Sequence, residues 1–220
     1  IIGRVAIALY KVNAHRRNYH RIKDQIIKKL STDPNNKKTN IDILFNKQDA
    51  FVEIEGFFTK YKTTLDLLAQ SLKPIYGVYH PTCSRGKIDG YRGKEMVNSL
   101  NNLSQTVKPH TLDLQALIKR NATNLDRQVF LRDQFVHYEE MKEFHGFRYS
   151  VKNKLVYPPI VLINQHESAF VHEYMDEQMD FLLTFSTEFL VTILSNLIGD
   201  MYLAQDKDEN WGWYSKTIGK

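Results

Sequence analysis

The chain has 220 residues, of which 42% are hydrophobic and 25% are charged, a composition typical of a globular protein with one large domain, alone or with an appendage. It contains neither low-complexity tracts nor fixed-period repeats, which argues against a disordered chain and against a solenoid. A single cysteine, Cys83, excludes an internal disulfide and favours a reducing compartment, so we expect a cytoplasmic protein.

The sequence predicts neither a signal peptide nor a membrane-spanning helix. The N-terminal residues lack the basic end, apolar core and small-residue cleavage site of a signal peptide. The most apolar window, residues 181–198, contains Glu188 and Asn196, and an ionised carboxylate is costly to place inside a bilayer. This window therefore predicts a buried core helix, and we expect no membrane partner.

The net charge of +5 is unevenly distributed along the chain. Residues 1–38 hold ten Lys or Arg against two Asp, a local charge of +8 that leaves −3 for the remainder. Such an arm suggests an anionic partner, because clustered cations release counterions from a phosphate backbone. The candidate nucleic-acid-binding residues are Arg16, Arg17, Arg21 and Lys28. The alternative is a solvated amphipathic helix whose polar face happens to be basic.

The first part of the chain predicts two long helices. Within residues 1–40, which we expect to form a basic helical arm, apolar residues recur on one side of a helix: Val5, Leu9, Val12, Tyr19, Ile22, Ile26 and Leu30. Residues 31–40 are rich in turn-forming types and end this helix. A second helix is predicted from about Gln48 to Lys73, where Pro74 disfavours helical dihedrals in the preceding residue.

The middle of the chain predicts three shorter helices. One follows the glycine-rich segment 77–94 and ends before Pro109, and another covers about residues 112–120. The third spans about residues 123–143. The glycine-rich segment lacks P-loop spacing, and its His80 and Cys83 are too few for a zinc site.

The last third predicts a β-hairpin and a final long helix. Residues 147–157 alternate apolar and polar types around a central turn. Asn164 and Glu167 fit a capping box that opens a helix running to about Ala204. The fold predicted is therefore all-α, with a helical domain over residues 41–205 and a small hairpin before its last helix. In the tail, residues 206–220, we expect the aromatic residues to pack on the body, with base stacking as the alternative.

The stretch RDQFVHYEE, residues 132–140, bears most directly on function. Cleavage of RNA without a metal needs a group that moves a proton and a group that stabilises charge on the phosphoryl oxygens. His137 titrates near neutral pH and suits the first role, whereas the planar, permanently charged fork of Arg132 suits the second. Asp133 precedes His137 by four residues and shares its helix face, so it can orient the imidazole.

The spacing alone is a weak signal. On a helix Arg132 and His137 lie about 140° apart around the axis and roughly 7.5 Å along it. The long arginine side chain must therefore extend around the helix to contact a phosphate that His137 also contacts. In a chain of this length and composition, the number of arginines followed by a histidine five residues later that is expected by chance is roughly one third. The alternative is that Asp133 and His137 only cap or bridge a surface turn.

The motif resembles the R-polar-x-x-x-H signature of the HEPN superfamily (higher eukaryotes and prokaryotes nucleotide-binding). Arg132, the polar Asp133 (commonly asparagine in the family), the aliphatic Val136 and His137 all match, and residues 51–72 look like an early HEPN core helix. The resemblance covers about residues 41–200. The basic arm, the hairpin and the tyrosine after the histidine are not part of the minimal signature.

The resemblance implies an antiparallel helical bundle and a metal-independent endoribonuclease, of a toxin–antitoxin or phage-defence system, that needs no cofactor. It implies Arg132, Asp133 and His137 as catalytic residues, RNA as substrate, a homodimer that brings two motifs together, and an antitoxin or nucleotidyltransferase partner. The alternative within the same family is a non-catalytic module that binds nucleic acid or a partner protein. A third hypothesis, from another class, is a helical scaffold whose basic arm keeps it soluble.

Two other groupings are weaker. His172 and Asp176 have the i, i+4 spacing that two metal ligands on a helix would have, but acidic residues near a helix start also complement the helix dipole. We favour the second explanation and expect no metal. Arg16 and His20 share a helix face without a polar residue at the matching position, and we assign them no catalysis.

Overall fold

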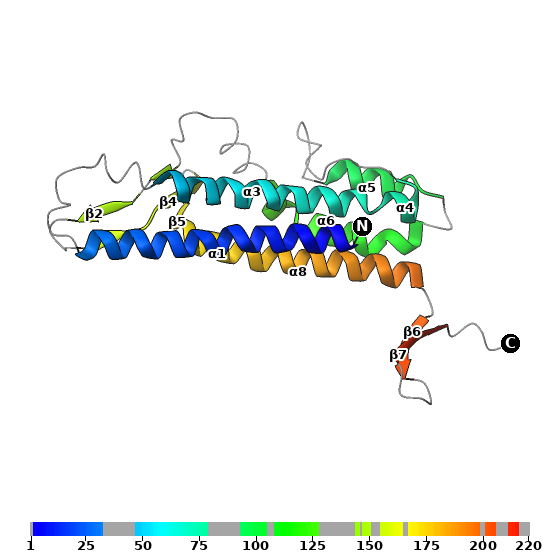
Figure 1. Ribbon diagram of the computed structural model, residues 1–220. Helices are drawn as coiled ribbons and strands as arrows, with labels where there is room; N and C mark the ends of the chain where they lie inside the picture. Colours follow the sequence, from blue (N-terminus) through cyan, green and yellow to red (C-terminus); the bar gives the residue numbers. More distant parts are fainter. Residues whose placement is uncertain are drawn as a thin grey trace.

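The computed structural model describes residues 2–32, 47–78, 93–104, 108–127, 144–145, 147–150, 155–164, 167–198, 201–205 and 211–215. Three long helices dominate it: α1 (Ile2–Thr32), α3 (Lys47–Gln70) and α8 (Val171–Ile198), which lie side by side in Figure 1. The mostly α-helical bundle with a small hairpin before its last long helix, predicted from the sequence, is confirmed.

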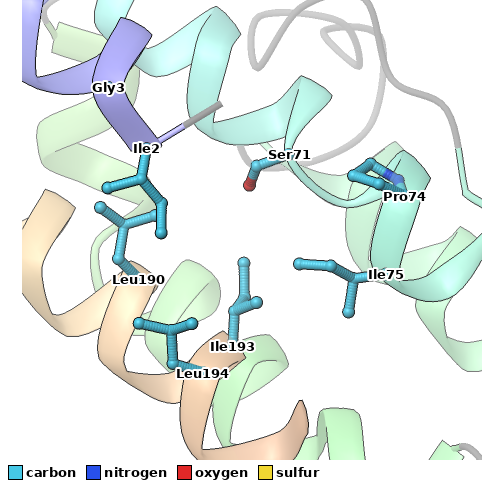
Figure 2. Close-up of a pocket in the computed structure, with 8 residues that line it drawn as sticks. All are labelled: Ile2, Gly3, Ser71, Pro74, Ile75, Leu190, Ile193 and Leu194. Atoms are coloured by element: carbon cyan, nitrogen blue, oxygen red, sulfur yellow. The ribbon is translucent and has the colours of Figure 1, made fainter.

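Contacts along the bundle give the direction of each helix. Arg16, at the middle of α1, binds Asp176 in the second turn of α8, whereas Ile2 at the start of α1 lines a pocket with Leu190 in the last third of α8 (Figure 2). The two helices are therefore antiparallel. Phe58 of α3 packs on Tyr174 near the start of α8, and Ser71, just after the end of α3, lines one pocket with Leu190 in the last third of α8, so these two helices run in the same direction, against α1.

The buried side of α1 follows a seven-residue spacing. Val5, Val12 and Tyr19 are fully buried, and Ile26 is nearly so. This spacing is close to two helical turns, and it keeps one stripe of the helix against its two neighbours. The apolar stripe predicted for this segment is thus confirmed, and α1 packs as one of the three long helices of the bundle.

Shorter helices close one end of the bundle: α4 (Lys73–Tyr76), α5 (Lys94–Asn101), the 3₁₀ turn η2 (Lys108–Thr111), α6 (Leu112–Arg120) and a helical stretch over 122–127. The predicted bounds of α6 are confirmed. Gly93 precedes α5 with φ of +85°, and an added Cβ would lie 2.6 Å from Ile118 Cγ2, so both backbone and space require glycine there.

The predicted end of the second helix at Lys73 was wrong. The helix α3 ends at Gln70, and Lys73 is the first residue of α4. Pro74 stands in the first turn of α4, where a missing backbone N–H costs nothing and the fixed φ of proline suits a helix start. The proline therefore starts a helix here and does not stop one.

The predicted hairpin over residues 147–157 is confirmed as β2 (Arg148–Ser150) paired antiparallel with β3 (Leu155–Tyr157). A three-stranded antiparallel sheet that the sequence analysis missed lies beside it. Its strands are β1 (Phe144–His145), β4 (Ile160–Asn164) and β5 (Glu167–Phe170), in the order β1-β4-β5.

The capping box predicted at Asn164 and Glu167 was wrong. These two residues pair across β4 and β5, and α8 begins only at Val171, whose N–H donates to the Pro159 carbonyl at 2.9 Å. Asparagine favours tight turns as readily as helix starts, and the apolar run before Asn164 completes a strand. The polar pair thus closes a strand pair here.

The predicted extension of the last helix to Ala204 was also wrong. The helix ends at Ile198, and the chain continues as an antiparallel pair, β6 (Met201–Gln205) and β7 (Trp211–Ser215). Figure 1 shows this pair, which we call the C-terminal hairpin, standing off the end of the bundle. None of the helices in the described ranges has the length and apolar character that a bilayer crossing requires.

Candidate functional site: a polar cluster between α1 and α8

The motif that the sequence analysis singled out, with Arg132, Asp133 and His137, lies outside the described residues. The chain before it is anchored in the bundle, because Leu125 is fully buried. Arg127, the last described residue ahead of the motif, donates a hydrogen bond to Glu167 of β5 at 3.2 Å. The roles assigned to the motif therefore remain predictions.

The described residues bring a different arginine, aspartate and histidine together. We call Arg16, His20, His172 and Asp176 the α1–α8 cluster. Arg16 Nη1 donates to Asp176 Oδ1 at 3.0 Å, and His20 Nε2 lies 3.0 Å from the same oxygen. Arg16 Nε also donates to Asn13 Oδ1 at 3.1 Å, which holds the guanidinium along α1. One carboxylate of α8 thus joins two side chains that stand one turn apart on α1.

His172 completes the cluster with a different environment. Its ring stands edge-on to His20, with centroids 5.9 Å apart, and tilts against Phe170 on its other side at 5.8 Å. Its Nδ1 is buried and has no hydrogen-bond partner within the described part of the chain. Burial, assisted by the nearby Lys23 cation, lowers the pKa of His172 below its ordinary value, although Glu173 and Asp176 partly oppose this. At neutral pH this imidazole is therefore uncharged.

The chemistry open to the α1–α8 cluster follows from these contacts. His20 is half-buried, with a carboxylate that fixes its ring and a neutral histidine beside it, so it is placed for proton transfer. The charge of Arg16 is largely committed to Asp176, which reduces its value as a free phosphate ligand. The cluster therefore ties α1 to α8 and contains acid–base groups, but little uncompensated positive charge.

The metal alternative raised for His172 and Asp176 finds no support in the described residues, where no group of three or more suitable ligand side chains converges. The dipole explanation also needs correction for Asp176. The acidic residue in the first turn of α8 is Glu173. Asp176 lies one turn later and accepts a hydrogen bond from Arg16 of α1. The sequence could not show this pairing, because Arg16 and Asp176 are separated by 160 positions.

A second histidine–carboxylate pair ties α1 to α3. His15 Nδ1 lies 2.7 Å from Glu53 Oε2, and Asn18 Nδ2 donates to the other carboxylate oxygen at 3.4 Å. The imidazole fits against α3 only because residue 56 is glycine. An added Cβ there would lie 2.5 Å from His15 Cε1. Nothing in the sequence pattern pointed to this contact.

The four residues predicted to bind nucleic acid divide into two groups. Arg16 is half-buried in the α1–α8 cluster, whereas Arg17, Arg21 and Lys28 are exposed. Helical spacing places these three on one face of α1, which we call the outer basic face, although the exposed Asp24 lies within it and is 3.3 Å from Lys23 Nζ. The outer basic face remains a candidate surface for contact with phosphate groups.

Comparison with protein-family models, with curated proteins and with solved structures finds no match to this chain.

Proposed function

We propose that the chain is a metal-independent endoribonuclease of the HEPN type, acting as a homodimer in a toxin–antitoxin or phage-defence system. The observation that carries this proposal is the motif RDQFVH at residues 132–137, with its arginine, polar residue, aliphatic residue and histidine at the spacing of the family signature. The mostly helical bundle is the kind of fold that the resemblance implies. An antitoxin or nucleotidyltransferase is the protein partner that such a system would supply.

The proposed reaction is a transesterification within RNA. A 2′-hydroxyl attacks the adjacent phosphorus, the bond to the 5′-oxygen breaks, and the products are a 2′,3′-cyclic phosphate and a 5′-hydroxyl. His137 removes the proton from the attacking hydroxyl or supplies one to the leaving oxygen. Arg132 stabilises the charge on the phosphoryl oxygens, and Asp133 orients the pair.

The outer basic face has a supporting role in this proposal. Arg17, Arg21 and Lys28 are exposed along α1, where they are free to hold an RNA backbone by its phosphates without reading its bases. We expect a smaller contribution from Arg16, because its guanidinium already donates to Asp176 and Asn13.

The second candidate function is a non-catalytic module that binds nucleic acid, and the outer basic face is the observation that favours it. A row of exposed cations needs no catalytic motif to bind phosphate, and RNA binding alone would explain the charge surplus of the first 38 residues.

One experiment separates the two functions. Purified protein is incubated in EDTA with a panel of single-stranded RNAs, and cleavage and binding are measured on the same samples. The ribonuclease proposal predicts discrete cleavage products that end in a cyclic phosphate. Binding without products across the panel would refute it in favour of the binding module, and the absence of both would leave the scaffold hypothesis. Cleavage that stops only on chelation would contradict metal independence.

A further inference from the structure

Charge is divided unequally among the three long helices, which lie side by side in Figure 1. Helix α1 carries eight Lys or Arg against one Asp, whereas α3 carries three Lys against four Asp or Glu. Helix α8 carries five Asp or Glu and neither Lys nor Arg. An RNA strand on this bundle is therefore attracted to α1 and repelled by the neighbouring α8.

An aromatic side chain continues the line of the outer basic face towards the start of α1. By helical geometry, Tyr10 lies within about 20° of Arg17, Arg21 and Lys28 around the helix axis. It precedes Arg17 by about 10 Å along that axis, and the whole line from Tyr10 to Lys28 is about 27 Å long. A row of cations combined with an aromatic ring is the arrangement with which many proteins bind single-stranded nucleic acid.

The ring of Tyr10 is available for such a contact. The residue is 65% exposed, and within the described part of the chain neither a hydrogen bond nor a ring contact holds its side chain. Its neighbours four residues away on either side, Ala6 and Ala14, are too short to cover the ring. Because every base presents a π-face, stacking on this ring would tolerate any sequence, as phosphate contacts do.

A membrane surface is the other anionic partner that suits cations beside exposed apolar residues. However, the apolar stripe of α1 is already packed in the bundle core. The large exposed apolar residues of α1 are Ile2, Ile7 and Tyr10, and all of them lie before the first cation of the outer basic face. The cations therefore have no apolar surface beside them that could insert between lipids, and the arrangement favours a single strand.

We propose that Tyr10 stacks on an unpaired base of an RNA strand whose phosphates lie along the outer basic face, and that this contact makes the face select single-stranded over double-stranded RNA. In a duplex the bases are paired and stacked on one another, so the ring finds no free base. The inference rests on RNA as the ligand, which the proposed function supplies, but it requires no cleavage. It applies equally to the ribonuclease and to the non-catalytic binding module.

The test measures binding to the full chain by fluorescence anisotropy with 2′-O-methyl RNA, which lacks the attacking hydroxyl and stays intact. The probes are an ordinary single strand, an abasic strand of the same length, and a duplex. Tyr10→Ala should weaken binding to the ordinary strand about fivefold or more. Its affinity for the abasic strand and for the duplex should stay within about twofold of wild type, because the phosphate contacts are unchanged. The salt dependence should also be unchanged, since the substitution removes no charge.

Two control variants separate stacking from other effects. Tyr10→Phe keeps the ring and should bind the ordinary strand as wild type does. Ile7→Ala removes a side chain of α1 that is 58% exposed, without removing a ring, and should change the affinity less than about twofold. Because both positions are exposed, all three variants should fold, and circular dichroism checks that they do.

Four results would overturn the proposal. Equal affinity of Tyr10→Ala and wild type for the ordinary strand would refute stacking and leave the ribonuclease proposal standing. An equal loss on the abasic strand, or in Ile7→Ala, would show a general apolar contact. Binding to anionic phospholipid vesicles that Tyr10→Ala abolishes, with no binding to the three probes, would assign this face to a membrane surface. A wild type that binds neither probes nor vesicles would remove RNA as the ligand. Absence of cleavage in EDTA together with the expected Tyr10 effect would refute the ribonuclease alone.

Discussion

Gly56→Ala tests how α1 and α3 pack, because the expected sign is opposite to that of helix propensity. Alanine in place of glycine inside a helix normally stabilises by about 1 kcal/mol. Here the new Cβ would stand 2.5 Å from His15 Cε1 and 2.6 Å from His15 Nδ1, distances that force the imidazole to move. Overpacking of this kind costs about 1–3 kcal/mol.

The imidazole cannot move without a second loss. Its Nδ1 lies 2.7 Å from Glu53 Oε2, and both side chains are mostly buried. Hydrogen bonds to charged groups contribute about 1.5–3 kcal/mol, and part of this would be lost. After the gain in helix propensity is subtracted, we expect Gly56→Ala to lower the free energy of unfolding by about 1–2 kcal/mol, combining these terms.

The assay is denaturant unfolding followed by the helical circular dichroism signal, carried out as a double-mutant cycle with His15→Ala. Without the imidazole the clash disappears, so Gly56→Ala should then be neutral or stabilising by up to about 1 kcal/mol. Gly3→Ala is the control, because nothing lies within 4 Å of its added Cβ. An equal destabilisation by Gly56→Ala in both backgrounds would refute the role of the His15 ring.

The remaining predictions concern pH and salt. The folded protein holds the pKa of His172 below its ordinary value of 6.5, so the unfolded chain takes up the proton first as pH falls through about 6.5, and the free energy of unfolding declines. In unfolding experiments from pH 7 to 5, His172→Phe should reduce that decline. An unchanged pH profile would contradict the burial argument. For RNA binding, the logarithm of affinity should fall with the logarithm of salt concentration by about 0.7 per phosphate neutralised on a single strand. Replacing Arg17, Arg21 and Lys28 with glutamine should reduce the magnitude of this slope by about 2. The control variant Arg16→Gln should change the slope little, because Arg16 is already paired with Asp176. Equal slopes in the triple variant and wild type would show the outer basic face to be only a solvated surface.

Local patterns in the sequence predicted much of the helical framework. The apolar residues of α1 recur at helical spacing, which requires no knowledge of the partner helix, and the segment Leu112–Arg120 is bounded by residues that end helices. Errors arose where one local pattern suits two structures. Asn164 fits a helix cap and a strand turn equally, and only the pairing of β4 with β5 decides between them.

The polar cluster could be predicted only in part. The sequence shows that Arg16 and His20 share a face and that His172 and Asp176 share another. It cannot show that the two faces meet, because that depends on how α1 and α8 pack. The need for glycine at position 56 is likewise invisible without the His15 ring, since a lone glycine in a helix has many causes.

The most direct test of the proposed function compares two histidines in one cleavage assay. The rate of RNA cleavage in EDTA is measured for wild type, His137→Ala and His20→Ala, after circular dichroism has shown that all three fold. The account predicts a loss of at least about a hundredfold for His137→Ala, the contribution of a general acid or base, and a rate within a few-fold of wild type for His20→Ala. The reverse pattern, with cleavage kept in His137→Ala and lost in His20→Ala, would contradict the account and place the chemistry in the α1–α8 cluster.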